Sequence, residues 1–557
     1  MQKHSDKPTA QLLSAALLKA GIRDIVISPG SRNAPLIIEF TNQPAFHNLS
    51  IVDERVAGFF ALGIAQQTGR PAVLVCTSGS ALLNYYPAIA EAFYSHIPLI
   101  VVSADRPQKW IDQGEGQTIR QHGVFKNHSW YNTTLSETGT EQDAYDIKQA
   151  IETAFKRRGP VHINMPFDEP LYQIIEKDLP ETGNIQTEFP DKIYEVGFLE
   201  QFEQKWQASK RKMILVGQHK PSEFLQLQLN KLAEDPSVII LTENIANVTN
   251  EKFINNIDQA IFSLDDDQLK DLKPDILMTI GRNIVSKKIK QFLRKHQPKE
   301  HWHVEKTALP PDTFEVLSQH FDTAPEMFLS QFLFLVKPVT SDYQQKWLDI
   351  KQKHKLLHQK FLQQTGFSDL KSFELISQNI PNGYMVQWGN SSTIRYAQLF
   401  DYKPDIIHFS NRGTSGIDGS TSTASGAAYA SGKPTLLVTG DISFLYDSNG
   451  LWHKYLPDNF KIILINNGGG EIFNFIPGPS QTGALNDFFV AKHRYDAAKL
   501  AEMYHLDYQK ASNLDELKTG IQKLFDKNDQ SQLLEINTKA VDNAEVLKAY
   551  FKSIKSL

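Results

Sequence analysis

The stretch TLLVTGDIS, residues 435–443, decides how the chain is expected to fold. Its apolar first half is typical of a strand buried in a parallel sheet. A second stretch of the same kind, IILINNGGG at residues 462–470, follows a segment in which we expect a helix from about Asp447. Because parallel strands point their carboxyl ends to one edge of a sheet, we expect Asp441 and Asn467 to lie close together at that edge.

Oxygen-bearing groups gather in these two turns. Asp441, Asn467 and the carbonyl group of Gly469 present the hard oxygen ligands that Mg²⁺ prefers, and Mg²⁺ often shares such a site with phosphate groups. The dipeptides Gly-Asp and Asn-Gly are also common in ordinary turns. On this stretch alone, a metal site and two plain strand-to-helix turns are equally good interpretations, and the rest of the chain has to separate them.

The bulk composition is that of a globular protein. The chain has 557 residues, 41% of them hydrophobic and 22% charged, which favours about two to four domains. The net charge of −5 gives no basic surplus for nucleic-acid binding, and the single cysteine, Cys76, excludes an intramolecular disulfide. Because the sequence contains neither an apolar signal segment nor a run of about 20 apolar residues, we expect a cytoplasmic protein that binds no membrane.

The first part of the chain repeats the order strand, small-residue turn, helix. We expect a helix at about residues 9–18 and strands at residues 24–27, 73–76, 99–102 and 161–164. This order is typical of a doubly wound sheet with helices on both faces. The polar segment 173–195, with scattered Pro and Gly, is expected to be a linker.

Two further parts of the chain repeat the pattern. We expect strands at residues 213–217, 238–241 and 276–281, and then a charged helical stretch at about 341–364. The opening stretch belongs to the part that follows. We therefore predict an α/β protein with three doubly wound parallel-sheet domains, at residues 1–185, 195–345 and 370–557.

Five separated motifs, together with the opening stretch, resemble those of a known family. Gly-Asp followed later by Asn-Asn is similar to the diphosphate-binding motif of thiamine-diphosphate enzymes, although Ile442 stands where that motif has a second glycine. One branch, the 2-succinyl-5-enolpyruvyl-6-hydroxy-3-cyclohexene-1-carboxylate (SEPHCHC) synthases of menaquinone biosynthesis, also has a non-glycine residue there. The motifs that resemble this branch are SPGSRNAPL (28–36), SADRP (103–107), QTIRQ (117–121), GNSSTIR (389–395) and NRGTSGIDG (411–419). The resemblance covers essentially the whole chain in order and spacing.

The resemblance implies a fold, a reaction and an assembly. The three domains would be the pyrimidine-binding, middle and diphosphate-binding domains of a transferase that uses thiamine diphosphate with Mg²⁺ or Mn²⁺. This transferase would decarboxylate 2-oxoglutarate and add the succinyl-semialdehyde carbanion to isochorismate in a 1,4-addition that gives SEPHCHC. The family resemblance also implies a homodimer, or a dimer of dimers, with active sites at the subunit interface.

Glu54 is the implied catalytic residue. It stands in VDERVAG (52–58), before a segment rich in Ala and Gly, where by itself it would be an acid favoured by the helix dipole. In the family, a glutamate at this place shares a proton with N1′ of the cofactor's aminopyrimidine, which lets the 4′-amino group activate the cofactor. The resemblance implies this role for Glu54 rather than for Asp53.

The other implied cofactor contacts come mostly from the last third of the chain. Ile417 matches the bulky apolar residue that bends the cofactor into a V, which brings its reacting atoms together. Ile472 and Phe473 match apolar positions of the pocket, although plain core packing is nearly as good an interpretation. The implied cofactor-binding residues are Glu54, Ser391, Ile417, Gly440, Asp441, Ile442, Ser443, Asn467, Ile472 and Phe473, with Asp441, Asn467 and Gly469 as metal ligands.

Both implied substrates are dianions, so their pocket needs Arg and Lys, and Arg suits carboxylates because it can bind them in a bidentate way. Four arginines of the motifs are expected in turns after strands, although each alone would more often be a solvated surface charge: Arg32, Arg106, Arg395 and Arg412. By resemblance, Arg395 and Ser391 contact the carboxylate derived from 2-oxoglutarate or the cofactor adduct, and Arg32, Arg106 and Gln117 contact isochorismate. The implied substrate-binding residues are Ser31, Arg32, Arg106, Gln117, Lys287, Lys288, Asn390, Ser391, Arg395 and Arg412.

Two alternatives stay open at this point. Another thiamine-diphosphate enzyme, such as a 2-oxo-acid decarboxylase or an acetohydroxyacid-synthase-like enzyme, would share Glu54 and the pair Asp441 and Asn467 but not the set of arginines. A nucleotide-binding or scaffold protein on a doubly wound fold is the other alternative, because a fold alone does not fix a function.

Overall fold

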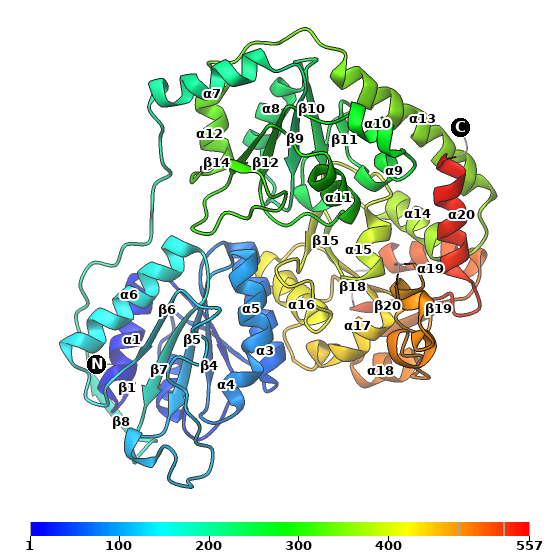
Figure 1. Cartoon of the computed structure of the whole chain (residues 1–557). Coiled ribbons are helices and arrows are strands. Elements are labelled where there is room, and N and C mark those ends of the chain that lie inside the picture. The colour runs from blue at the N-terminus through cyan, green and yellow to red at the C-terminus, as the bar shows by residue number, and fades with distance from the viewer. Residues whose placement is uncertain (1, 476–477, 527–529, 556–557) are drawn as a thin grey trace. The chain divides into compact units, whose positions relative to one another are not determined.

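Three six-stranded parallel sheets form the framework of the protein (Figure 1). The computed structural model describes residues 2–475, 478–526 and 530–555. The predicted α/β fold class is confirmed, because each sheet is parallel and carries helices connecting its strands. The bounds predicted for the three domains stay a prediction.

The first sheet is built from the N-terminal third of the chain. Its strands lie in the spatial order β3 (His47–Ser50), β2 (Asp24–Ile27), β4 (Ala72–Cys76), β5 (Leu99–Asp105), β7 (Val161–Pro166) and β6 (Tyr131–Thr134). Side chains alternate across the sheet, so that Ile25 and Ile27 join one hydrophobic core and Val26 joins the other. The first core is completed by α1 (Pro8–Lys19), α2 (Ala34–Thr41) and α6 (Glu141–Arg157), and the second by α3 (Glu54–Thr68), α4 (Ala81–Asn84) and α5 (Tyr86–Ser95).

The middle sheet has a different strand order. Its strands run β11 (Phe253–Ile254), β10 (Val238–Thr242), β9 (Lys212–Val216), β12 (Ile276–Ile280), β13 (Glu300–Val304) and β14 (Leu317–Phe321). Here the chain starts at a central strand and winds outward first to one side and then to the other. One face packs on α7 (Val196–Ala208), α8 (Glu223–Leu232) and α12 (Pro325–Phe332), and the other on α9 (Ile257–Ile261), α11 (Lys287–Lys295) and α13 (Tyr343–Gln364), with α10 (Asp266–Asp271) beside them.

The third sheet repeats the topology of the first. Its strands run β16 (Ile407–Ser410), β15 (Met385–Trp388), β17 (Thr435–Gly440), β18 (Phe460–Asn466), β20 (Gln532–Asn537) and β19 (Asp507–Ala511). Numbered along the chain within each sheet, both sheets have the order second, first, third, fourth, sixth, fifth. One hydrophobic core holds α14 (Asp369–Asn379), α15 (Ser392–Ala397), α19 (Leu514–Asp526) and α20 (Asn543–Lys555); α16 (Ser420–Ser431), α17 (Asp441–Tyr446) and α18 (Ala497–Met503) complete the helices of this part.

This topology places a switch point between the first and third strands of both sheets. The chain leaves β2 toward one side and β4 toward the other, and likewise leaves β15 and β17 in opposite directions. In open α/β sheets, ligands bind outside the carboxyl ends of the strands at such a point. The predicted residues Arg32, Ser391 and Asp441 all follow strands that flank a switch point.

Two compact units divide the chain in a way that the sequence did not indicate. One holds residues 1–189, 411–433 and 443–460, and the other holds the remainder. Within the first unit, α3 packs closely against α16, because a Cβ atom at Gly63 would overlap the carbonyl oxygen of Thr423 and one at Gly426 would overlap that of Phe60. Glycine at both positions therefore lets the two helix backbones touch.

Three expectations need correction. The helix after Gly440 begins at Asp441 and not at about Asp447, because the carboxylate of Asp441 accepts from the amide of Ile442 at 2.7 Å and its charge suits a helix start. β5 extends to Asp105 through residues expected in a turn. The segment expected as a linker contains β8 (Ile174–Lys177), which pairs antiparallel with β1 (Gln2–Ser5).

Within the described residues, no helix is long and apolar enough to cross a membrane.

Candidate active site

Asp441 lies directly after β17, at the edge expected for it, and is 2% exposed. Its Oδ2 accepts a hydrogen bond of 2.7 Å from the backbone amide of Gly468. The structure thus brings the start of α17, directly after β17, and the glycine run after β18 together. The prediction that these two strand ends meet is confirmed, while the metal-binding role stays a prediction.

The side chain of Asn467 is bound by Asp369, which belongs to none of the motifs. Nδ2 of Asn467 donates a hydrogen bond to Oδ2 of Asp369 at 2.9 Å. The amide oxygen of Asn467 therefore does not face Asp369. Burial raises the pKa of Asp369 to about 6, with a smaller contribution from the charge of Asp441. Asp369 and Asn467 are 98 positions apart, so no local sequence pattern could have connected them.

The donor set at this edge fits a hard cation. Asp441, Asn467 and the carbonyl of Gly469 supply oxygen atoms only, which suits Mg²⁺ or Mn²⁺ bound jointly with a diphosphate. The carbonyl of Gly469 also accepts from the amide of Glu471 at 2.9 Å. Among the described residues there is no cluster of three or more His, Cys, Asp or Glu side chains that could hold a metal, so a site here needs the amide and carbonyl oxygens as well.

Two ionisable groups near this edge were missed. Nε2 of His493 lies 3.0 Å from Oδ2 of Asp441, and His493 belongs to none of the motifs. Burial raises the pKa of Glu471 to about 7, and the charge of Asp369 contributes. Glu471 directly precedes the two predicted pocket residues Ile472 and Phe473, which lie half-buried in a short 3₁₀ helix, Glu471–Asn474.

The end of β15 carries three of the predicted substrate-binding residues. Asn390 is buried, and Ser391 caps α15 with a φ of +67°, a strained backbone conformation of the kind that clusters at functional sites. Arg395 is not in a turn as expected but in α15, where its Nη1 donates to the carbonyl of Ser391. The helix therefore positions Arg395 one turn after Ser391.

The two lysines of the middle region lie at the first turn of α11, and both are exposed. Nζ of Lys288 lies 4.6 Å from the ring centre of Phe262. Burial raises the pKa of Asp258, while a hydrogen bond from Ser286 and the charges of Arg395 and Lys288 counteract this. The charges of Arg395 and Lys288 therefore both act on the carboxylate of Asp258.

Arg32 and Arg106 follow β2 and β5, and the positive charge of Arg106 acts on Arg32. Arg32 is 4% exposed, donates from Nη1 to the carbonyl of Phe167 at 2.9 Å and lies 3.2 Å from the carboxylate of Glu169. Burial and then the nearby charge of Arg106 lower the pKa of Arg32. Because two close cations repel each other, an anionic ligand here would relieve the repulsion.

Polar atoms that follow β2, β4 and β5 lack partners in the described part of the chain. Nε of Arg32, Nε of Arg106, Oγ1 of Thr77 and Oγ of Ser78 are buried without a hydrogen-bond partner in the described part of the chain. An unpaired buried donor is costly, so these atoms fit a polar anionic ligand. Thr77 and Ser78 are candidate site residues that the motifs did not reveal, because a Thr-Ser pair in a turn is common.

The two remaining predicted residues of this region lie at the surface. Ser31 is exposed beside Arg32, and Gln117 is exposed with a φ of +56°. A Cβ atom at Gly79 would lie 3.1 Å from the Cα of Gln117, so the turn after β4 and the loop that carries Gln117 are in contact.

Glu54 is the first residue of α3, with Asp53 as its N-cap, and burial raises its pKa. The next residue, Arg55, connects the start of α3 with two other segments. Arg55 Nη1 donates to the backbone carbonyl of Asp418 and, at 2.8 Å, to Oδ1 of the buried Asp447. Arg55 thereby fixes the beginning of the helix that carries Glu54.

The loop of residues 411–419 carries Arg412 and Ile417. Oγ of Ser443 donates to the carbonyl of Ile417 at 2.9 Å, so two predicted cofactor-binding residues are in contact. Glu91 of α5, which is 1% exposed, accepts from the amide of Gly413 at 2.8 Å. This loop and the start of α3 lie in the same compact unit.

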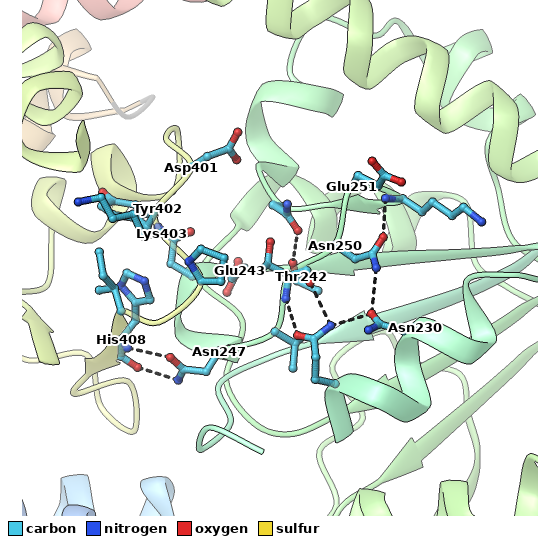
Figure 2. A pocket seen from close by; sticks show the side chains of 18 of the residues that line it. Asn230, Thr242, Glu243, Asn247, Asn250, Glu251, Asp401, Tyr402, Lys403 and His408 are labelled. Atoms are coloured by element: carbon cyan, nitrogen blue, oxygen red, sulfur yellow. Dashed lines mark hydrogen bonds between the residues drawn. The ribbon is translucent and has the colours of Figure 1, made fainter. Parts of the chain in front are cut away.

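A large open pocket of about 1440 Å³ lies elsewhere, between α8, α13 and the loop before β16 (Figure 2). Many of its polar side chains bind one another: Asn247 bonds the backbone of His408 at 2.7 and 2.9 Å, and Asn250 donates to Asn230 at 3.0 Å. Its described lining includes no predicted site residue. We interpret it as a space between packed segments and not as the reaction site.

Three models of protein families match consecutive parts of the chain. Residues 8–124 match the N-terminal TPP binding domain of thiamine pyrophosphate enzymes, residues 197–382 the middle domain and residues 389–536 the C-terminal TPP binding domain. Thiamine pyrophosphate is another name for thiamine diphosphate. Together with the three sheets, these matches define the class: the chain is a thiamine pyrophosphate enzyme.

The similar proteins narrow this class. The chain is 50% identical over 537 residues to the SEPHCHC synthase of Flavobacterium johnsoniae, with 96% of both chains covered. It is 49% identical over 547 residues to that of Flavobacterium psychrophilum, covering 98% of this chain and 99% of the other, and 44% identical over 577 residues to that of Christiangramia forsetii, covering both fully. The chain therefore belongs to the SEPHCHC synthase family, which confirms the resemblance found in the motifs.

Proposed function

We propose that this protein catalyses the thiamine-diphosphate-dependent decarboxylation of 2-oxoglutarate and the addition of the resulting succinyl-semialdehyde unit to isochorismate, which gives SEPHCHC in menaquinone biosynthesis. The relatives support it by their names. The observation that carries it on this chain is a set of buried donors without partners in the described residues, which follow β2, β4 and β5 of the first sheet: Nε of Arg32, Oγ1 of Thr77, Oγ of Ser78 and Nε of Arg106. A plain 2-oxo-acid decarboxylase would not need this second anion site.

The proposed cofactor site uses both ends of the chain. Asp441, Asn467 and Gly469 would hold Mg²⁺ or Mn²⁺, and Gly440, Ile442, Ser443 and Ser391 would line the diphosphate. Ile417, Ile472 and Phe473 would provide apolar contacts, and Glu54 would hold a proton at the pyrimidine end, a role supported by its raised pKa. The bound cofactor supplies the carbanion chemistry, and the protein supplies binding and orientation.

Positively charged side chains would bind the carboxylates of the substrates and orient them. Arg395, held against Ser391 in α15, would bind a carboxylate of 2-oxoglutarate together with Asn390. Arg32, Arg106, Gln117, Ser31 and Arg412 would bind isochorismate. Lys287 and Lys288, the exposed pair at the start of α11, are proposed to reach isochorismate from the middle domain.

A homodimer, or a dimer of dimers, completes the proposal. The pyrimidine-binding, middle and diphosphate-binding domains are proposed at residues 1–185, 195–345 and 370–557, with the active sites between subunits. The expected cytoplasmic location remains a prediction that accompanies this function.

Turnover with 2-oxoglutarate, in the presence and absence of isochorismate, tests the reaction. We expect SEPHCHC to form only with both substrates, with little free succinic semialdehyde. Substantial release of free succinic semialdehyde without adduct would instead identify a decarboxylase. For the scaffold alternative, titration with thiamine diphosphate decides: binding that requires Mg²⁺ supports the enzyme, and absence of such binding supports the scaffold.

A further inference from the structure

Asp369 is a fully buried carboxylate that the proposed reaction does not use. It is the first residue of α14 and is 0% exposed. Oδ2 accepts from Nδ2 of Asn467 at 2.9 Å, and Oδ1 accepts from Oγ1 of Thr538 at 2.6 Å. Burying a carboxylate is expensive, so its presence beside the glycine run calls for a physical reason.

The contact decides which end of the Asn467 amide is available. An ionised carboxylate can only accept hydrogen bonds, so the atom of Asn467 that faces it must be the NH₂ group. The carbonyl oxygen of Asn467 is then directed away from Asp369. This oxygen is the only atom of the side chain that can coordinate a hard cation.

Asp369 is itself held rigidly. Its backbone amide donates to Oδ1 of Asn543 at 2.8 Å, and Nδ2 of Asn543 donates to Oγ1 of Thr538 at 3.2 Å. The backbone amide of Thr538 donates to the carbonyl of Asn466 at 3.0 Å, which closes the network at the residue before Asn467. The carboxylate of Asp369 is thus fixed by four segments: the starts of α14 and α20 and the ends of β18 and β20.

We propose that Asp369 is a positioning residue for the metal: it orients the amide of Asn467 so that its oxygen faces the cation, and it places a second negative charge behind the ligands. Groups that orient metal ligands in this way commonly affect metal affinity strongly. The inference rests on the proposed metal site of Asp441, Asn467 and Gly469. It adds to that site a residue that does not touch the cation.

The test measures metal binding directly. The dissociation constant for Mn²⁺, in the presence of thiamine diphosphate, is determined by electron paramagnetic resonance for the full-length wild type and for Asp369→Asn, Asp369→Ala and Thr538→Val. We expect affinities about 10-fold to 100-fold weaker for the Asp369 variants and a smaller loss for Thr538→Val. Glu374→Gln is the matched control, because this carboxylate lies on the same helix but pairs with Lys371 at 2.6 Å.

Rescue separates positioning from stability. If Asp369 acts through the metal, raising the Mn²⁺ concentration restores the activity of Asp369→Asn while the folded fraction, followed by circular dichroism, stays constant. If the variant is partly unfolded, the folded fraction rises together with the activity, because metal binding stabilises the folded state. Wild-type Mn²⁺ affinity in both Asp369 variants would overturn the inference. Asp441→Asn separates the proposed metal site from the proposed role of Asp369. Undiminished Mn²⁺ binding in Asp441→Asn would overturn both proposals. Lost Mn²⁺ binding in Asp441→Asn, with unchanged binding in the Asp369 variants, would overturn only the role of Asp369.

Discussion

The carboxylate of Glu91 holds the backbone of Thr414. Oε2 of Glu91 accepts from the amide of Thr414 at 2.7 Å and from its hydroxyl at 2.9 Å, while Oε1 accepts from Gly413 and from Ser95. Glu91 lies on α5, and Thr414 lies in the loop that carries Arg412 and Ile417. One buried acid of the first sheet region thus fixes a loop that is 323 positions further along the chain.

Glu91→Ala is expected to loosen this loop, because two backbone amides lose their acceptor and each unsatisfied buried donor costs about 1–3 kcal/mol. Hydrogen exchange of a peptide spanning residues 411–419 should become faster, and the affinity for thiamine diphosphate should fall. Ser95→Ala, which removes only one donor to Glu91, is the control and should have a much smaller effect. Unchanged exchange in Glu91→Ala would show that the loop is held by other contacts.

Glu54→Gln is expected to fold normally but to lose most activity, by about 100-fold or more, because the amide cannot share a proton with the cofactor. Asp53 caps α3 through its own side chain in the variant as in the wild type, so the melting temperature should change little. Steady-state turnover and thermal unfolding measure the two effects. A rate like that of the wild type would refute the catalytic role of Glu54.

Arg395→Ala is expected to raise the KM for 2-oxoglutarate by about 10-fold or more and the KM for isochorismate much less, because a charge-assisted hydrogen bond to one substrate is lost. Arg395→Lys should recover only part of this loss, since a lysine cannot bind a carboxylate in a bidentate way. Initial rates with each substrate varied in turn give both values. An equal rise in both KM values would argue against a specific contact with 2-oxoglutarate.

Mixing two inactive variants tests whether active sites are shared between subunits. If Glu54 and Asp441 of different subunits serve one site, refolded mixtures of Glu54→Gln and Asp441→Asn should regain about one quarter of wild-type activity, because half of the random dimers hold one intact site of two. The alternative is an active site within a single subunit, since α3 packs on α16 of the same chain. In that arrangement, mixing restores nothing.

The folded protein is expected to lose stability in acid because of the buried His162. Its ring bonds the hydroxyl of Ser103 at 2.7 Å, and burial lowers its pKa to about 3. Below about pH 6.5 the unfolded chain binds a proton at this ring that the folded chain does not, so stability falls as pH decreases, by at most about 1.4 kcal/mol per pH unit. His162→Gln cannot be protonated, and its melting temperature should fall less steeply than that of the wild type between about pH 7 and pH 5. Parallel curves would contradict this assignment.

Buried strands could be predicted closely from the sequence. The strand predicted at residues 24–27 is β2 itself, and those at 238–241 and 435–439 differ from β10 and β17 by one residue. Continuous apolar runs are a strong signal because both faces of a parallel sheet are covered. No such signal marked the edge strands β3 and β19, whose side chains are largely polar or partly exposed.

The candidate site could be predicted only in part. Residues just beyond the ends of strands were found because the end of an apolar strand is recognisable, as for Arg32 and Asp441. Asp369, Glu91 and His493 were not, because each acts through a contact between segments far apart in the chain. Such contacts depend on the packing of whole elements, which a single sequence read by local pattern does not encode.

The crossing of α3 and α16 at Gly63 and Gly426 has a consequence for protein engineering. Because backbone packs against backbone there, no flexible side chain is available to absorb a displacement. The helix α3, which starts at Glu54, and the helix α16, which follows the loop of Ile417, therefore move together as one rigid pair. Libraries that aim at a new substrate range should leave both glycines untouched and vary the loops. A single added methyl group at either position would push the two helices apart, and so shift both the start of α3 at Glu54 and the loop of Ile417.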